Sequence, residues 1–301
     1  MGLSFYNIKK WTKMMLGTSI LHVNQGVGKM YSKKEIKGYY NDLTEKVLKD
    51  EDYSEVKIPL VETEQGHEVM FPIAIFQYGL GAYDLYLSDS KELYLEKFKI
   101  CANWALENQN SNGSWECFNY IYPENPFSSM CQGEGASLLI RAYQEFENQK
   151  YLSAAKRAID FMLVSIEDGG TTYYTKNEIF LKEYTHKPVV LNGWIFSIFG
   201  LYDYLLVKSD NKIEKLYILT IKTLVDNLHR FDNGYWSKYD CESMLASPFY
   251  HNLHIAQLKT LYDLTNENIF EDYACKWQSY ENRFVNRQRA FFAKAYQKIT
   301  E

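Results

Sequence analysis

The sequence predicts a mainly α-helical fold: an incomplete α/α barrel (toroid) of about four helical hairpins with a small N-terminal arm. From residue 70 onward, apolar residues recur at helical spacing in long stretches. The stretches come in pairs, the first rich in small and apolar residues and the second carrying more charge. Turns with a glycine and aromatic residues follow the first three pairs, at Gly113, Gly169 and Gly234, 56 and 65 residues apart. Such periods indicate stacked hairpins, with an inner ring of buried helices and an outer ring of amphipathic ones.

The composition favours one continuous domain. The chain has 301 residues, 46% of them hydrophobic, which is enough for a sizeable core. Only six prolines occur, and no Pro/Gly/Ser-rich linker is visible. We therefore divide the chain into an N-terminal arm, residues 1–69, and a helical toroid, residues 70–301. The 26 tyrosines suit core packing or a carbohydrate site, and composition alone favours core packing.

The arm shows weaker patterns than the toroid. A short helix is expected near Ile8 to Leu16, and Lys33 to Val47 is polar with some helical spacing. Val56 to Val61 is expected to be extended, and a turn is expected near Gln65-Gly66.

The toroid is expected to contain eight helices in four pairs. The predicted inner helices span residues 72–88, 132–148, 189–207 and 248–264, and the outer helices span 92–108, 152–166, 213–228 and 269–280. The third inner helix is introduced by Pro188, because proline suits a first helical turn. This helix also contains Asn192 and Asp203, which need polar partners if the helix is buried.

Charge and cysteine content exclude several functions. The net charge is −5 and no basic block occurs, so nucleic acid binding is not expected. The five cysteines are scattered without a CxxC pair, so neither a disulfide framework nor a zinc site is indicated and a reducing compartment is expected. The N-terminus lacks a signal-like apolar core. Polar residues and glycines interrupt the apolar run 189–207, so no integral membrane segment is expected and a cytoplasmic location is predicted.

A charged and aromatic cluster precedes the third inner helix. Glu183, Tyr184, His186 and Lys187 lie within five residues of one another, immediately before the apolar run. An acid and a tyrosine at the mouth of a buried helix are a suitable combination for proton-transfer chemistry.

Several blocks of the sequence resemble the C-terminal domain of the D-glucuronyl C5-epimerases, which convert glucuronate to iduronate within heparosan and heparan chains. Their order and spacing hold from about residue 70 to 280, while residues 1–60 match less clearly. The blocks are FPIAIFQYGL (71–80), MCQGEGAS (130–137) with LLIRAY (138–143), EY (183–184), VLNG (190–193), GLYD (200–203), YD (239–240), YHNLHI (250–255) and QL (257–258). We expect the chain to lack the large N-terminal β-region and membrane anchor of the animal enzymes.

The resemblance implies an incomplete α/α barrel whose cleft holds the uronate, with a glutamate and tyrosines as catalytic groups. By motif these are Glu183, Tyr184, Tyr239 and Tyr250. The resemblance also implies a basic residue soon after the Tyr-Asp pair, where this chain has Cys241-Glu242.

Epimerisation at C5 removes the hydrogen alpha to a carboxylate and returns it to the opposite face. The site therefore needs a base, an acid on the other face and donors for the carboxylate oxygens. Glu183 can be the base if burial raises its pKa, and Tyr250 can be the acid. Tyr184 and Tyr239 can hold the substrate, polarise its carboxylate or relay protons. This chemistry requires no metal or organic cofactor.

Further residues are candidates for substrate binding, each with a structural alternative. The polar residues of the inner helices either form hydrogen bonds with one another or face sugar hydroxyls. His186 either contacts the substrate or caps the start of the helix. The two histidines three residues apart lack a third metal ligand, so they pack or bind substrate. The tryptophans after the Gly turns stack on sugars or fill the core. The candidates are Gln132, Glu134, Asn192, His186, His251, His254, Trp115 and Trp236.

The sequence thus favours a uronyl C5-epimerase that acts on a glucuronate-containing polysaccharide or oligosaccharide. The resemblance implies a part in surface-glycan synthesis. Two alternatives stay open. A uronate polysaccharide lyase would begin with the same proton abstraction and then expel the O4 substituent, and a glycan-binding toroid would keep the aromatic cleft without catalysis. A homodimer is compatible with the sequence.

Overall fold

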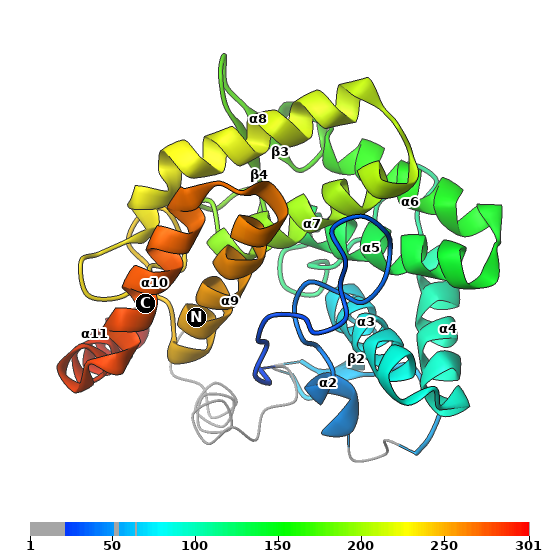
Figure 1. The fold of residues 1–301 in the computed structure, drawn as a ribbon, viewed down its shortest axis with the longest axis horizontal. Helices are drawn as coiled ribbons and strands as arrows, with labels where there is room; N and C mark the ends of the chain where they lie inside the picture. The colour runs from blue at the N-terminus through cyan, green and yellow to red at the C-terminus, as the bar shows by residue number, and fades with distance from the viewer. Residues whose placement is uncertain (1–21, 51–53, 64, 301) are drawn as a thin grey trace.

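The computed structural model describes residues 22–50, 54–63 and 65–300, and helices dominate it (Figure 1). The long helices of the toroid form hairpins joined by short turns. These are α3 (Pro72–Asp89) with α4 (Glu92–Glu107), α5 (Ser129–Phe146) with α6 (Gln149–Met162), α7 (Leu191–Val207) with α8 (Asn211–Asn227), and α9 (Pro248–Thr265) with α10 (Asn268–Asn282). The helix expected near residues 8–16 lies outside the described residues.

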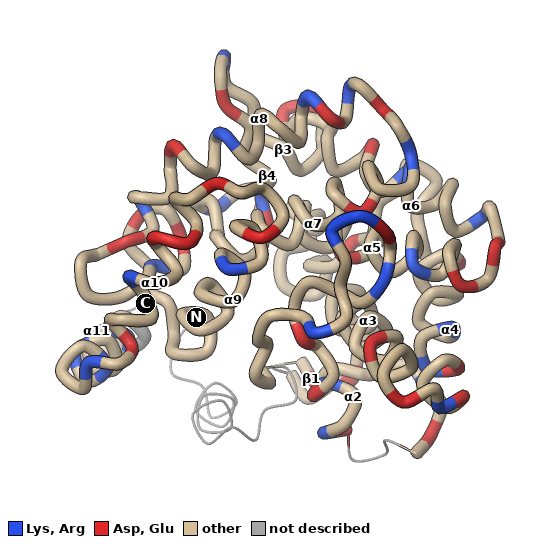
Figure 2. Tube along the Cα trace, in the orientation of Figure 1, with Lys and Arg blue, Asp and Glu red and all other residues tan. Residues whose placement is uncertain are grey.

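The first helix of each hairpin belongs to an inner ring. α3 packs on α5, α5 on α7 and α7 on α9. The helices α3, α5 and α7 bury most of their residues and α9 buries half, all in one continuous core. The second helices are amphipathic, and Lys, Arg, Asp and Glu are interspersed along them (Figure 2). The predicted helical toroid of four hairpins is therefore confirmed.

The glycine turns that suggested the repeat have the expected backbone. Gly113, Gly169 and Gly234 have φ angles of 94°, 84° and 87°, in the region that only glycine enters readily. Three of the inner helices end with a non-glycine residue in the left-handed conformation, at Ser90, Glu147 and Asn266. Three of the four hairpins therefore share a turn geometry although their sequences differ, while α7 ends with Lys208 in an extended conformation.

The N-terminal arm contains little regular structure. It has the short helix α2 (Glu45–Leu48) and a two-stranded antiparallel ribbon of β1 (Val61–Glu62) and β2 (Glu68–Val69). The turn expected near Gln65-Gly66 is present, with a φ of 79° at Gly66. The extended segment expected at 56–61 is a strand only at its last residue.

The arm bridges the two ends of the helical series. The Tyr39 N–H donates to Asp84 of α3 at 2.8 Å, while the Tyr40 carbonyl accepts from Thr260 of α9 at 3.2 Å. Tyr31 also donates to Asp263 of α9 at 2.9 Å. The arm is therefore bonded to the first and the last inner helix (Figure 1).

A buried ion pair ties the arm to the middle of the ring. Arg141 of α5 lies 2.6 Å from Asp203 of α7, and the Tyr40 hydroxyl donates to the same carboxylate at 2.7 Å. Asp203 thus has the partners that its place in a buried helix requires. The Arg141 side chain is 1% exposed, so this ion pair is fully buried.

Several elements differ from those expected for residues 70–301. The helix introduced by Pro188 begins only at Leu191. The segment after α6 forms a 3-10 turn, η1 (Ile166–Asp168), and a ribbon of β3 (Thr172–Tyr174) and β4 (Ile179–Leu181). A second 3-10 turn, η2 (Leu228–Phe231), follows α8, and α11 (Phe284–Thr300) ends the described chain.

Across the described ranges, no helix is both long and apolar enough to span a bilayer.

Candidate active site

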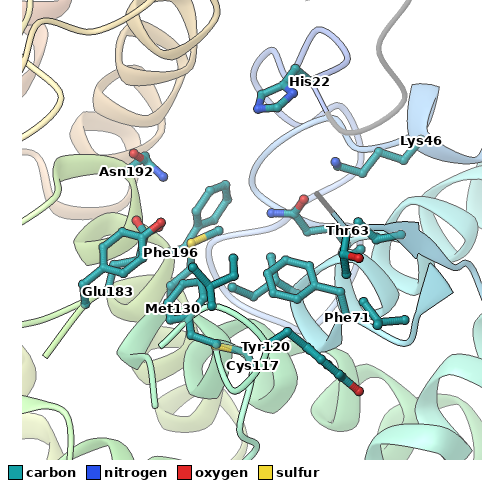
Figure 3. A pocket seen from close by; sticks show the side chains of 18 of the residues that line it. His22, Lys46, Thr63, Phe71, Cys117, Tyr120, Met130, Glu183, Asn192 and Phe196 are labelled. Atoms are coloured by element: carbon teal, nitrogen blue, oxygen red, sulfur yellow. The ribbon is translucent and has the colours of Figure 1, made fainter. Parts of the chain in front are cut away.

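A cleft of about 460 Å³ opens between the arm and the inner helices. Its walls come from the arm, the β1–β2 ribbon, the start of α3, the loop around Phe118 and the first turns of α5, α7 and α9 (Figure 3). Glu183, Tyr184, Asn192 and Tyr250 line it. Segments far apart in the chain therefore form one site.

Two loops that carry site residues are joined by backbone hydrogen bonds. The Leu191 N–H donates to the Tyr239 carbonyl at 3.1 Å, and the Cys241 N–H donates to the Val189 carbonyl at 3.0 Å. This antiparallel pairing keeps residues 189 and 190 extended, which explains why α7 begins three residues after Pro188. It also fixes Tyr239 beside the loop of Glu183.

The Glu183 carboxyl group is buried and incompletely bonded. It is 5% exposed, its Oε1 accepts from the Tyr239 hydroxyl at 3.4 Å, and its Oε2 has no hydrogen-bond partner among the described residues. The carboxyl group packs against α7 at Gly193. Glycine is needed at this position, because a Cβ there would come within 3.0 Å of the carboxyl group. Burial raises the pKa of Glu183 to about 7, although the hydroxyls of Tyr184 and Tyr239 and the Lys187 charge oppose this. The group can therefore gain or lose a proton near neutral pH.

Three tyrosines lie near this carboxyl group, and the hydroxyl of one of them, Tyr239, contacts it. The rings of Tyr239 and Tyr250 meet edge to face with centroids 4.8 Å apart, and Tyr184 stacks on Phe118 at 4.5 Å. Burial, together with the Glu183 charge, raises the pKa of Tyr184, Tyr239 and Tyr250. All three are protonated at neutral pH and can donate. Tyr239 stands behind Glu183 rather than in the cleft wall.

The inner-helix polar residues occupy different depths. Asn192 lines the cleft, and its Oδ1 has no hydrogen-bond partner among the described residues. Glu134 is fully buried behind the wall, where its Oε1 accepts from Gln77 at 2.8 Å, and burial raises its pKa to about 8. Gln132 lies away from the cleft, with its amide against the backbone of the Gly113–Trp115 turn.

The remaining candidates do not line the cleft. His186 is exposed and packs on Tyr122 at 4.8 Å. His251 and His254 are buried and both contact the Ser237 hydroxyl, at 2.8 and 3.0 Å. Trp236 stacks on His251 at 3.7 Å.

The two tryptophans have the structural role that the sequence left open. The indole N–H of Trp115 donates to the Ala105 carbonyl at 3.0 Å, and that of Trp236 donates to the Ala246 carbonyl at 3.1 Å. Each is 1% exposed, so neither can stack on a sugar in this conformation. Within the described ranges, no group of three or more His, Cys, Asp or Glu side chains is placed to hold a metal ion.

Gln77 and Lys46 are among the cleft residues that were not singled out from the sequence. Gln77 is the one amide of the inner helix α3, so the polar-residue signal that singled out Asn192 could have found it. Lys46 sits in a polar stretch of the arm, where nothing distinguishes it from its neighbours. Cys241 and Glu242, which stand where the resemblance implies a basic residue, do not line the cleft.

The fold and the cleft define a class of protein, a helical toroid whose central cleft holds a buried carboxyl group among tyrosines. Comparison with known proteins identifies the family. The model of the D-glucuronyl C5-epimerase C-terminus matches residues 109–279, more than half of the chain, so the chain belongs to this family.

Individual relatives are more distant. A D-glucuronyl C5-epimerase of Caenorhabditis elegans is 27% identical over 223 residues, which cover 64% of this chain and 36% of that protein. An uncharacterized protein of Methanocaldococcus jannaschii is 30% identical over 172 residues, covering 54% of this chain and 56% of that protein. The chain thus spans about a third of the first relative and just over half of the second.

Among solved structures, an endo-β-1,4-glucanase from Acetobacter xylinum superposes with a TM-score of 0.47 and 13% identity. The match covers 73% of this chain and 72% of that one. The toroid described above rests on the packing of this chain's own helices.

Proposed function

We propose that the chain is a uronyl C5-epimerase that converts D-glucuronate to L-iduronate residues in a polysaccharide or oligosaccharide. The observation that carries the proposal is the Glu183 carboxyl group, buried at the cleft with one unbonded oxygen and beside Tyr239 and Tyr250. A base with a pKa of about 7 next to protonated phenols provides both halves of a proton exchange.

The reaction begins with proton transfer to Glu183. The C5–H bond breaks, the proton goes to the carboxylate, and the electron pair moves into the substrate carboxylate to give an enediolate. Tyr250 then donates its hydroxyl proton to C5 from the opposite face. Glu183 is left protonated and Tyr250 is left as a phenolate. Tyr239 contacts both, so its hydroxyl can pass a proton between them and restore the starting state.

The other cleft groups hold the substrate. The Asn192 amide lies at the same wall as Glu183, and Tyr184 lines the cleft beside it, so both can bind sugar hydroxyls or the carboxylate. The substrate partner is a glucuronate-containing glycan, and residues 70–301 carry the catalytic groups. The cytoplasmic location stays a prediction.

Solvent deuterium incorporation at C5 of a glucuronate oligosaccharide tests the proposal. The wild type is expected to incorporate deuterium and to yield iduronate. Glu183→Gln and Tyr250→Phe are expected to lower the rate by about 10²–10⁴-fold, the usual contribution of a positioned acid or base. Tyr204→Phe is a matched control, because Tyr204 is also buried but does not line the cleft.

The alternatives give different products. Appearance of the absorbance of an unsaturated uronate identifies a lyase and overturns the epimerase assignment. Binding without deuterium incorporation on every uronate glycan tested indicates a glycan-binding toroid.

A further inference from the structure

The cleft contains one residue whose charge is opposite to that of a uronate. Among the described residues that line it, Lys46 is the only lysine or arginine. The side chain extends from the arm into the cleft, from the side opposite Glu183 and Asn192 (Figure 3). It is 5% exposed, unlike most lysines, whose ammonium groups lie in water.

Close packing of the arm on α3 places Lys46. A Cβ at Gly81 of α3 would overlap the Leu43 carbonyl, so the glycine lets the arm backbone approach the helix. Leu43 and Val47, on either side of Lys46, are fully buried in the core. The segment that carries the lysine is therefore anchored, and its side chain has little choice of direction.

Burial does not neutralise this lysine at pH 7. It lowers the pKa of Lys46 only to about 8, and Glu134 behind the cleft wall opposes the shift when it is ionised, with a pKa that burial raises to about 8. The ammonium group thus stays mainly protonated at pH 7. Glu134 itself is held by Gln77, which lines the cleft next to these groups. Burying a charge is unfavourable, and a buried charge in a cleft points to a role in function.

We propose that Lys46 binds the carboxylate of the substrate uronate and stabilises the additional negative charge that develops on it when the C5 proton leaves. The proposal rests on the function proposed above. The enediolate carries one charge more than the ground-state carboxylate, so a fixed cation stabilises the transition state more than the substrate. Glu183 takes the proton from one side of the cleft while Lys46 receives the charge from the other, with Glu134 and Gln77 as positioning residues.

The test compares two ligands in the wild type, two Lys46 variants and one control variant. A glucuronate oligosaccharide and its carboxyl-reduced counterpart are titrated by calorimetry into wild type, Lys46→Met and Lys46→Arg. Lys49→Met is the matched control, because Lys49 lies next to the same short helix but is exposed and paired with Glu45. Deuterium incorporation at C5 is measured for the same proteins.

The wild type is expected to prefer the uronate ligand. Lys46→Met is expected to weaken uronate binding by about 10-fold or more, the loss typical of a desolvated charge contact, and to leave the reduced ligand unaffected. Its maximal exchange rate is expected to fall by about 10²–10³-fold, as when one donor to a developing anion is removed. Lys46→Arg should retain part of both properties, and Lys49→Met should equal wild type.

If Lys46→Met weakens the binding of both ligands equally and lowers the unfolding temperature, Lys46 has a structural role and the proposal is overturned. C5 exchange that survives Lys46→Met unchanged also overturns it, as does a wild type that does not discriminate the two ligands. If wild type shows no exchange but prefers the uronate through Lys46, the epimerase assignment fails while carboxylate binding by Lys46 stands.

Discussion

At the residue scale, burial separates the titrating groups of the cleft into an acid–base set. The pKa of Glu183 rises to about 7, while the pKa values of the neighbouring tyrosines rise above their usual value of 10. The carboxyl group can therefore ionise at a pH at which every phenol keeps its proton. Desolvation is the largest cause of both shifts and disfavours the charged form of both residue types, so the two pKa values stay as far apart as carboxyl and phenol groups ordinarily are.

The pKa shifts predict a bell-shaped pH profile. Glu183 acts as a base only when ionised, so activity is expected to rise as the pH increases through about 7. Lys46 acts only when protonated, so activity should fall as the pH increases through about 8. The groups that modulate these values are Lys187 near Glu183 and Glu134 near Lys46, and Glu134 itself has a pKa of about 8. The measurement is kcat/KM for deuterium incorporation between pH 5 and 10, which reports the free enzyme.

Lys46→Arg provides the control for the alkaline limb. Arginine stays protonated throughout this range, so the decline above pH 8 should disappear while the acid limb is unchanged. A rate that is constant from pH 6 to 9 in wild type is incompatible with these assignments.

At the residue scale, the signal available in the sequence was a polar group that interrupts an apolar pattern. Asn192 and Asp203 were singled out in this way, and the structure gives the first a place in the cleft and the second a buried ion pair. Lys46 could not be found, because a lysine in a polar segment is ordinary until tertiary packing buries it. Glu134 was found, but its position behind the cleft wall depends on how α5 packs.

At the element scale, periodicity located the eight helices of the toroid to within a few residues. It failed where backbone pairing between distant segments competes with local propensity. Pro188 is well suited to begin a helix, yet residues 189–190 stay extended because they pair with residues 239–241. A single sequence carries no signal for such a pairing.

The loop after Tyr239 is organised by Asp240. Its Oδ1 accepts from the backbone N–H groups of Glu242, Ser243 and Met244, each at 3.0 Å. Asp240→Ala should therefore loosen the loop and cost about 1–3 kcal/mol of unfolding free energy, because these donors lose a shared partner. Exchange activity should fall as well, since Tyr239 is no longer fixed against Glu183. Urea unfolding and C5 deuterium incorporation measure the two effects.

Two variants serve as comparisons for this loop. Asp240→Asn keeps an acceptor oxygen and should lie between wild type and Asp240→Ala. Asp160→Ala removes an exposed carboxylate paired with Lys156 and should change little. Full activity in Asp240→Ala despite lower stability would show that Tyr239 is held by other contacts.

At the scale of the whole molecule, the arm is part of the site. It bridges α3 and α9, lines the cleft and supplies Lys46. Sequence patterns predicted the toroid because its helices repeat. The same patterns predicted little of the structure of the arm, because its conformation is set by tertiary hydrogen bonds such as that from Tyr40 to Asp203. The division of the chain at residue 69 therefore separates regions that differ in pattern, although the cleft uses residues from both.

The Arg141–Asp203–Tyr40 network is the central attachment of the arm, and its removal should affect binding from a distance. Asp203→Leu leaves Arg141 buried without its carboxylate and removes the acceptor of the Tyr40 hydroxyl. Loss of one partner of a buried pair costs about 3–5 kcal/mol, whereas replacing both partners by apolar residues often costs little. Arg141→Met combined with Asp203→Leu should therefore be more stable than Asp203→Leu alone. The matched exposed pair, Lys156 and Asp160, should show no such coupling beyond about 1 kcal/mol.

Hydrogen–deuterium exchange shows whether the arm itself responds. In Asp203→Leu, the amides of Gly28, Tyr39 and Asp42, which bond within the arm or to α3, should exchange faster than those of α10. Uronate binding should weaken in parallel, because Lys46 belongs to the loosened segment, while the reduced ligand should be affected less. The double variant restores charge balance but not the Tyr40 contact, so it should recover stability more than it recovers binding. If arm protection and uronate affinity instead stay at wild-type values in Asp203→Leu, the bonds to α3 and α9 hold the arm without the buried network.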